Sequence, residues 1–105
     1  MSYFRVILTQ NNDYIAIRSE HAFSINFTNA SNFDGALIKT YKAFTKQDGN
    51  IGFDDLTDKV NGSGQQIVYS KPQDATYQSG IKNNWIIFKL LNRTANTSIV
   101  ATINI

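Results

Sequence analysis

The sequence has 105 residues, a net charge of +2 and 42% hydrophobic residues, which fits one domain with a hydrophobic core of its own. It contains no cysteine, so disulfide bonds and thiolate chemistry are excluded. No cluster of lysine and arginine is long enough to predict binding to nucleic acid or to a membrane surface, and no apolar run approaches a membrane span. We therefore expect a single domain over 1–105.

Alternation of apolar and polar residues predicts strands in the first third of the chain. Phe23, Ile25 and Phe27 are separated by single polar residues, which places them together on one face of a strand. Asn and Asp residues between the first two strands favour a turn. The predicted strands of this region span 3–10, 14–19 and 22–28.

The next segment is compatible with a helix or a strand. Leu37, Tyr41 and Phe44 have helical spacing, whereas the threonine and aromatic residues around them favour a strand. The following pair Asp48-Gly49 favours the strand, because Asp-Gly is typical of a two-residue hairpin turn with positive φ at both residues. The sequence therefore predicts a strand that ends near residue 47 and turns back on itself.

The second half of the chain is predicted to contain four more strands. They are expected at 50–53, 66–70, 85–91 and 97–105. A short helical turn is expected at 54–60, capped by Asp54 or Asp55, and a long irregular connection at 73–84. The strand at 85–91 is apolar on both faces, which is typical of a central strand. About eight strands with short turns predict an all-β, antiparallel β-sandwich, with jelly-roll and immunoglobulin-like connectivity both open.

Residue types that catalyse reactions are scarce. His21 is the only histidine and is expected in a surface turn. Residues 48–55 resemble the second half of a calcium-binding loop, but Phe44 and Lys46 occupy two positions where that loop needs carboxylates. The nearby acidic residues are interpreted as a solvated loop rather than as a glycosidase pair: Asp54, Asp55 and Asp58. We expect no metal, no cofactor and no enzymatic activity.

Aromatic rings near the 73–84 connection are candidate ligand contacts. An exposed ring of Trp85 or Tyr77 would stack on a sugar, while neighbouring amides would provide hydrogen bonds. The residues expected at this ligand-binding site are Trp85, Tyr77, Tyr69, Asn83 and Asn84. The alternative interpretation is that Trp85 fills the core of the sandwich.

The second apolar face of the 85–91 strand is a candidate interface. It carries Trp85, Ile87 and Leu91, whereas the other face of the same strand is expected in the core. An apolar outer face and the free edges of a sheet are both buried by symmetric partners in oligomers. We therefore expect a homo-oligomer with these three residues at the subunit contact.

The composition is also informative, with thirteen Ile, twelve Asn and seven Lys, a bias that suits an AT-rich genome. The N-terminal residues predict no leader peptide. In its overall character, a small cysteine-free β domain rich in Asn and Thr, the chain resembles the accessory virion proteins of tailed bacteriophages. That resemblance implies a capsid decoration, fibre or tail component, located in the virion with other virion proteins as partners. The alternative functions are a carbohydrate-binding module and a host-receptor adhesin.

Overall fold

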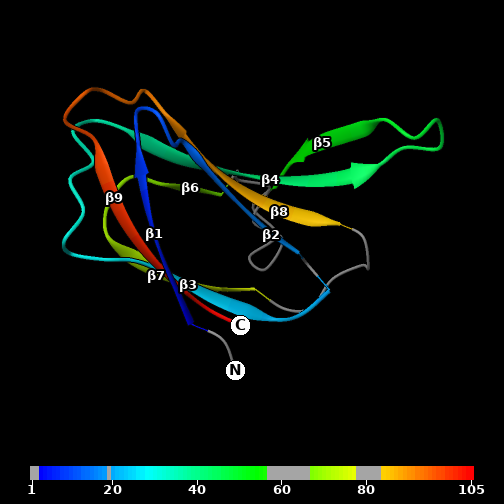
Figure 1. The fold of residues 1–105 in the computed structure, drawn as a ribbon, viewed down its shortest axis with the longest axis horizontal. Coiled ribbons are helices and arrows are strands. Elements are labelled where there is room, and N and C mark those ends of the chain that lie inside the picture. Colours follow the sequence, from blue (N-terminus) through cyan, green and yellow to red (C-terminus); the bar gives the residue numbers. More distant parts are fainter. Residues whose placement is uncertain (1–2, 19, 57–66, 78–83) are drawn as a thin grey trace.

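The computed structural model describes residues 3–18, 20–56, 67–77 and 84–105, which form an all-β fold of two antiparallel sheets (Figure 1). Its strands are β1 (Tyr3–Thr9), β2 (Tyr14–Arg18), β3 (Phe23–Phe27), β4 (Leu37–Thr45), β5 (Ile51–Asp55), β6 (Val68–Tyr69), β7 (Gln73–Tyr77), β8 (Trp85–Leu91) and β9 (Ser98–Asn104). Sheet A has the order β1-β9-β3-β7, and sheet B has the order β2-β8-β4-β5 with β6 also paired to β4. The predicted β-sandwich is confirmed.

The chain changes sheet at most of its connections. β1 and β3 belong to sheet A, whereas β2 and β4 belong to sheet B, and the last three strands again alternate. In the described part of the chain, β4 and β5 are the only consecutive strands that pair with each other. β8 lies between β2 and β4, so the central position predicted from its apolar faces is confirmed.

The core lies between the sheets around Phe88. This ring is fully buried, and its centroid lies 5.6 to 6.4 Å from those of Phe23, Phe27, Tyr69 and Tyr77. Tilted and edge-to-face ring contacts add to the stabilisation that burial of apolar area provides. Because the contributing rings come from both sheets, this cluster holds the two layers together.

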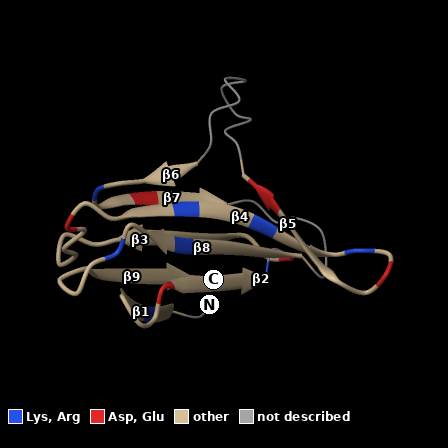
Figure 2. Ribbon diagram, turned by 90° about the horizontal axis from the view of Figure 1, so that it is seen from above, with Lys and Arg blue, Asp and Glu red and all other residues tan. Residues whose placement is uncertain are grey.

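The β4–β5 hairpin extends beyond the body of the sandwich (Figure 1, Figure 2). At its tip the Lys46 N–H donates to the Asn50 carbonyl over 2.8 Å, and the Gly49 N–H donates to the Lys46 carbonyl over 3.0 Å. Gly49 has a φ of 87°, whereas Asp48 does not have a positive φ. The turn is therefore a three-residue loop with glycine in the left-handed position, and the expected two-residue geometry was wrong although the hairpin itself was predicted correctly.

Two other expectations for the second half of the chain were wrong. Asp54 and Asp55 belong to β5 and pair with β4, so they cap no helical turn; residues 57–60 lie outside the described residues. The connection expected to be irregular contains β7, which pairs with β3 along five residues. β7 is an edge strand with mostly polar side chains, so its sequence lacks the apolar alternation that identified the other strands.

The described part of the chain contains no helix with the length and hydropathy needed to span a lipid bilayer.

Candidate functional site: the outer face of sheet B and the adjoining groove

Side chains on the outer face of sheet B are mostly apolar or aromatic. One row across four paired strands consists of Arg18, Trp85, Ala43 and Phe53. The next row consists of Ala16, Ile87, Tyr41 and Asp55. Ala43 is buried although it lies on the outer face, because its two large row neighbours flank it. We call this surface the aromatic face and define it by Tyr14, Tyr41, Phe53, Val68, Trp85, Ile87 and Leu91, with Ile51 continuing it into the hairpin.

Two of the positive charges on the outer face of sheet B lie over rings, and a third, Lys89, lies between Tyr14 and Lys39 in the strand register. The Arg18 guanidinium lies 5.6 Å from the Trp85 ring centre, and the Lys39 ammonium lies 5.1 Å from the Tyr41 ring centre. Lys39 Nζ also lies 3.3 Å from Asp55 Oδ2. Desolvation lowers the pKa of Lys39, but hydrogen bonds and charge attraction involving Tyr41 and Asp55 outweigh it, so the pKa is raised. The face therefore combines apolar area with two cations, Arg18 and Lys39, that lie against its aromatic rings.

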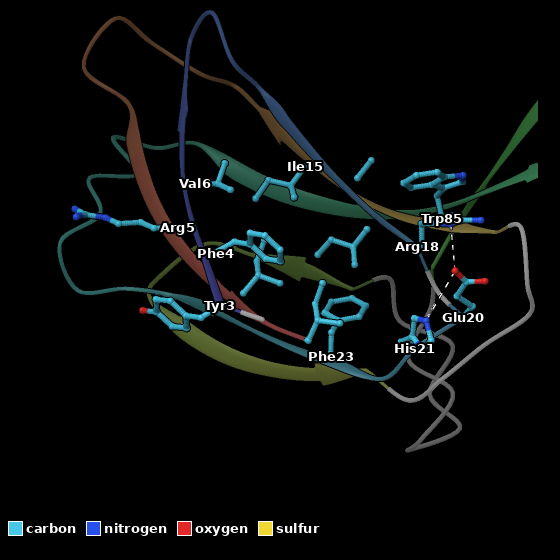
Figure 3. Close-up of a pocket in the computed structure, with 14 residues that line it drawn as sticks. Tyr3, Phe4, Arg5, Val6, Ile15, Arg18, Glu20, His21, Phe23 and Trp85 are labelled. Atoms are coloured by element: carbon cyan, nitrogen blue, oxygen red, sulfur yellow. Dashed lines mark ion pairs between the residues drawn. The ribbon is translucent and has the colours of Figure 1, made fainter. Parts of the chain in front are cut away.

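An apolar groove opens between β1 and β2, the adjacent edge strands of the two sheets (Figure 3). It has a volume of about 640 Å³ and is lined by apolar residues that include Phe4, Val6, Ile15, Ile17, Phe23 and Ile103. Phe4 pairs with the buried Ile103 and therefore faces the interior of the sandwich, yet it is 49% exposed. Between these two edges, no described strand covers the core.

Charged side chains lie at the mouth of the groove. Arg18 Nε lies 3.4 Å from Glu20 Oε1, and His21 Nε2 lies 3.9 Å from the same oxygen, as the dashed lines in Figure 3 show. The imidazole adds a charge only when it is protonated. Arg18 and Trp85 both line the groove and also form a row of the aromatic face. The groove and the aromatic face are therefore contiguous at this pair.

The tyrosines of the predicted ligand site point into the sandwich. The hydroxyl oxygens of Tyr69 and Tyr77 lie 2.5 Å apart, and the Tyr77 ring stacks on Phe23 with the centroids 5.0 Å apart. Burial raises the pKa of both hydroxyls. The hydrogen bond between them raises the pKa of Tyr69 further and partly opposes the rise at Tyr77. Trp85 is on the outer face, so the structure does not bring the tyrosines and Trp85 together as a sugar-stacking group.

The other described residues of the predicted ligand site and interface lie on β8 or directly before it. Ile87 and Leu91 are half-buried on the aromatic face with Trp85, the shared face that their alternation predicted. Asn84 is partly exposed directly before β8, and Asn83 lies outside the described residues. Trp85 itself is 39% exposed and does not occupy the core.

Of the acidic residues singled out in the sequence, Asp48, Asp54 and Asp55 lie in the β4–β5 hairpin. Asp48 Oδ1 accepts the N–H of Asn50 over 2.9 Å and thereby stabilises the turn. Asp58 lies outside the described residues. Within the described ranges, no group of three or more His, Cys, Asp and Glu side chains is placed to hold a metal ion.

Tyr41 and Phe53 of the aromatic face and Phe4 of the groove were not among the predicted site residues. Their alternation was visible in the sequence, but which side of each strand remains outside depends on strands far away along the chain. No protein-family model, no curated protein and no solved structure matches the chain.

Proposed function

We propose that the protein is a non-enzymatic assembly module that docks on other protein subunits through the aromatic face. One observation carries this proposal: of nine described large hydrophobic residues that are exposed, five lie on this one side of the molecule. These five are Tyr14, Ile51, Phe53, Val68 and Trp85. Scattered exposed apolar residues are ordinary, whereas a contiguous apolar patch marks an interaction surface.

The extent of this surface fits a protein interface. The five side chains are 39% to 60% exposed. With whole-residue areas of about 150–250 Å², they leave on the order of 500 Å² in contact with water. Contact between two such surfaces would bury about 1,000 Å², which is the lower limit expected of a specific interface. Half-buried neighbours such as Ile87 would add to this area.

We assign the assembly to a virion, where the protein would act as a capsid decoration, fibre or tail component. Its partners would be further copies of itself and other virion proteins. The support for this assignment is the overall resemblance to accessory phage proteins, combined with a β-sandwich that leaves one sheet face apolar. Capsid, portal or tail genes beside the gene of this protein are the expected finding, and a polysaccharide operon in that place would contradict it.

The docking surface is tested by Ile87→Glu, because Ile87 lies at the centre of the aromatic face on the central strand β8. Thr102→Glu is the matched control, since Thr102 is a half-buried, outward-facing residue of β9, a central strand of sheet A. We expect sedimentation velocity to show self-association that Ile87→Glu weakens at least tenfold, because a buried unpaired carboxylate is costly. Thr102→Glu should leave the association unchanged.

A hydrophobic dye gives a second measurement for this surface. If the wild-type protein requires a different subunit and is monomeric alone, the dye should bind it, and Ile87→Glu should reduce that binding. A monomer that binds no dye, or variants that behave identically, would contradict the proposed docking surface.

A carbohydrate-binding function is the second candidate, favoured by the exposed Trp85 ring on a sheet face. Arg18 already lies over this ring, so a sugar would have to use its other side or displace the guanidinium. Glycan-array binding that is lost in Trp85→Ala, with the circular dichroism spectrum retained, would favour this function. Tyr77 is unsuitable for the same test, because its substitution would disturb the core.

A further inference from the structure

β1 is the less protected of the two edges of sheet A. Natural edge strands avoid unwanted pairing through charges, proline or short length. β7, at the other edge of sheet A, follows Pro72 and carries Asp74. β1 is seven residues long and contains a single charged residue, Arg5. It exposes three large hydrophobic side chains, Tyr3, Phe4 and Ile7.

Hydrogen bonds at the end of β1 show which backbone groups face the groove. Thr9 and Asn12 exchange N–H···O bonds of 2.9 and 3.2 Å in the turn, and Asn12 Nδ2 donates to the Ile7 carbonyl over 3.0 Å. Backbone groups of alternate strand residues point to the same side, so those of Tyr3 and Arg5 also point towards the groove. Since β1 pairs only with β9 in the described structure, no strand bonds to this side.

β5, in the projecting hairpin, has complementary properties. It pairs only with β4, and no described strand pairs with its other edge. Ile51 and Phe53 are 56% and 60% exposed on one side of the strand. Asp54 lies on the opposite side because side chains alternate, and it forms no ion pair within the described residues.

The hairpin is also stiffened by its own side chains. The Phe44 ring lies across the strand from Gly52, so closely that a Cβ at this glycine would be 2.5 Å from Phe44 Cζ. An aromatic ring over a cross-strand glycine stabilises the pairing of the two strands. A preorganised arm loses less conformational entropy on binding than a flexible one.

We propose that the β4–β5 hairpin of one copy docks in the β1–β2 groove of a second copy, with β5 added to the free edge of β1. This proposal rests on the proposed assembly function. In it, the hairpin end of the aromatic face binds a second copy of the same chain. Ile51 and Phe53 enter the groove over Phe4, which places Asp54 on the same outer side as Arg5. The Arg5 side chain has no ion-pair partner in the described residues, so the two charges complement each other.

An added strand fits the groove better than a small apolar ligand does. One wall of the groove is a strand edge whose N–H and C=O groups need hydrogen-bond partners, and an apolar ligand would bury them without any. A strand satisfies these groups while its alternate side chains fill the apolar space. β5 has five residues and β1 has seven, so β5 can pair within the length of β1. Because hairpin and groove are different surfaces, the contact is heterologous and generates rings or filaments.

Mixing two complementary variants tests this geometry. Phe4→Glu blocks the groove but keeps the hairpin, and Ile51→Glu blocks the hairpin but keeps the groove. Each substitution is introduced into a protein that already carries Ile87→Glu, which we call the parent. Ile87→Glu removes contacts through the centre of the aromatic face. We expect each variant alone to associate at least tenfold more weakly than the Ile87→Glu parent in sedimentation velocity. An equimolar mixture should form a one-to-one heterodimer, since it contains one intact groove and one intact hairpin.

Three outcomes would overturn hairpin docking: association of either variant at the strength of the parent, a mixture that remains monomeric, or a parent that never associates. None of these decides the proposed function, which depends on the separate comparison of Ile87→Glu with Thr102→Glu.

Exchanging the charges provides a second test if one of these variants does not fold, as judged by circular dichroism. Arg5→Glu and Asp54→Arg copies should each associate more weakly than the parent, whereas a mixture of the two should recover association. A mixture that is no stronger than its components would also exclude the contact.

Discussion

The outer faces of the two sheets differ although their inner faces are alike. Both inner faces supply apolar side chains to one core around Phe88. Outside, the strands β3, β7 and β9 of sheet A carry one apolar residue, Val100, and otherwise polar ones: Ser24, Asn26, Asp74, Thr76, Ser98, Thr102 and Asn104. Sheet B presents the aromatic face in the corresponding position.

This difference separates the requirements of folding from those of interaction. A sandwich needs apolar residues between its sheets, whereas its outward-facing positions are ordinarily polar. On β3, β7 and β9 of sheet A, Val100 is the one apolar exception to that rule among the described outward positions, so the fold itself does not require an apolar exterior. The exposed rings of sheet B therefore need a reason beyond folding, and docking on another protein surface provides one.

The largest expected effect compares neighbouring residues of β8 that point to opposite sides. Phe88→Ala should reduce the free energy of unfolding by about 3–5 kcal/mol, because it leaves a cavity in the core shared by both sheets. Ile87→Ala, on the aromatic face, should cost about 1 kcal/mol or less, since its side chain is only half-buried. Urea unfolding measures both values, and equal losses would show that the outer face is as important for stability as the core.

An intermediate effect concerns alkaline pH and the tyrosine pair that joins the sheets. Tyr69 lies on β6 in sheet B and Tyr77 on β7 in sheet A, and burial raises the pKa of both above the ordinary value of 10.0. The unfolded chain therefore loses these protons first as the pH rises. Stability from this pair is complete below pH 10 and decreases above it, by up to about 1.4 kcal/mol per pH unit for each tyrosine.

The double variant Tyr69→Phe, Tyr77→Phe provides the control for this pH dependence. Its unfolding free energy should decrease less steeply above pH 10, because neither ring can ionise in the unfolded chain. Urea unfolding at pH 8 and pH 11 measures the difference. The same slope in both proteins would mean that the buried hydroxyls do not link the two sheets as the structure indicates.

The smallest expected effect is on the aromatic face itself, at the ion pair of Lys39 and Asp55. Asp55→Asn should lower the melting temperature less than any other substitution discussed, because both groups are solvent-accessible and water screens their attraction. High salt should remove the difference from wild type. A large salt-independent loss would instead indicate that Asp55 supports the strand pairing of the hairpin.

Strand alternation made most of the fold predictable. Trp85–Leu91 was predicted with its observed bounds, and the hairpin position followed from Asp-Gly. β7 escaped prediction because its polar edge sequence carries no periodic apolar signal. The helical turn at 54–60 was expected from local capping residues, but pairing with β4 keeps Asp54 and Asp55 extended. Local preference was outweighed there by hydrogen bonds to a neighbouring strand.

The sequence by itself determined that the chain forms antiparallel sheets and which residues share a strand face, because alternation is a property of neighbouring residues. It placed Ile87 and Leu91 beside Trp85 for that reason. Only the tertiary structure decided that Tyr69 and Tyr77 point inward, that Tyr41 and Phe53 extend the aromatic face, and that Phe4 lies in an open groove. These depend on strand order and register, which are set by contacts between segments distant along the chain.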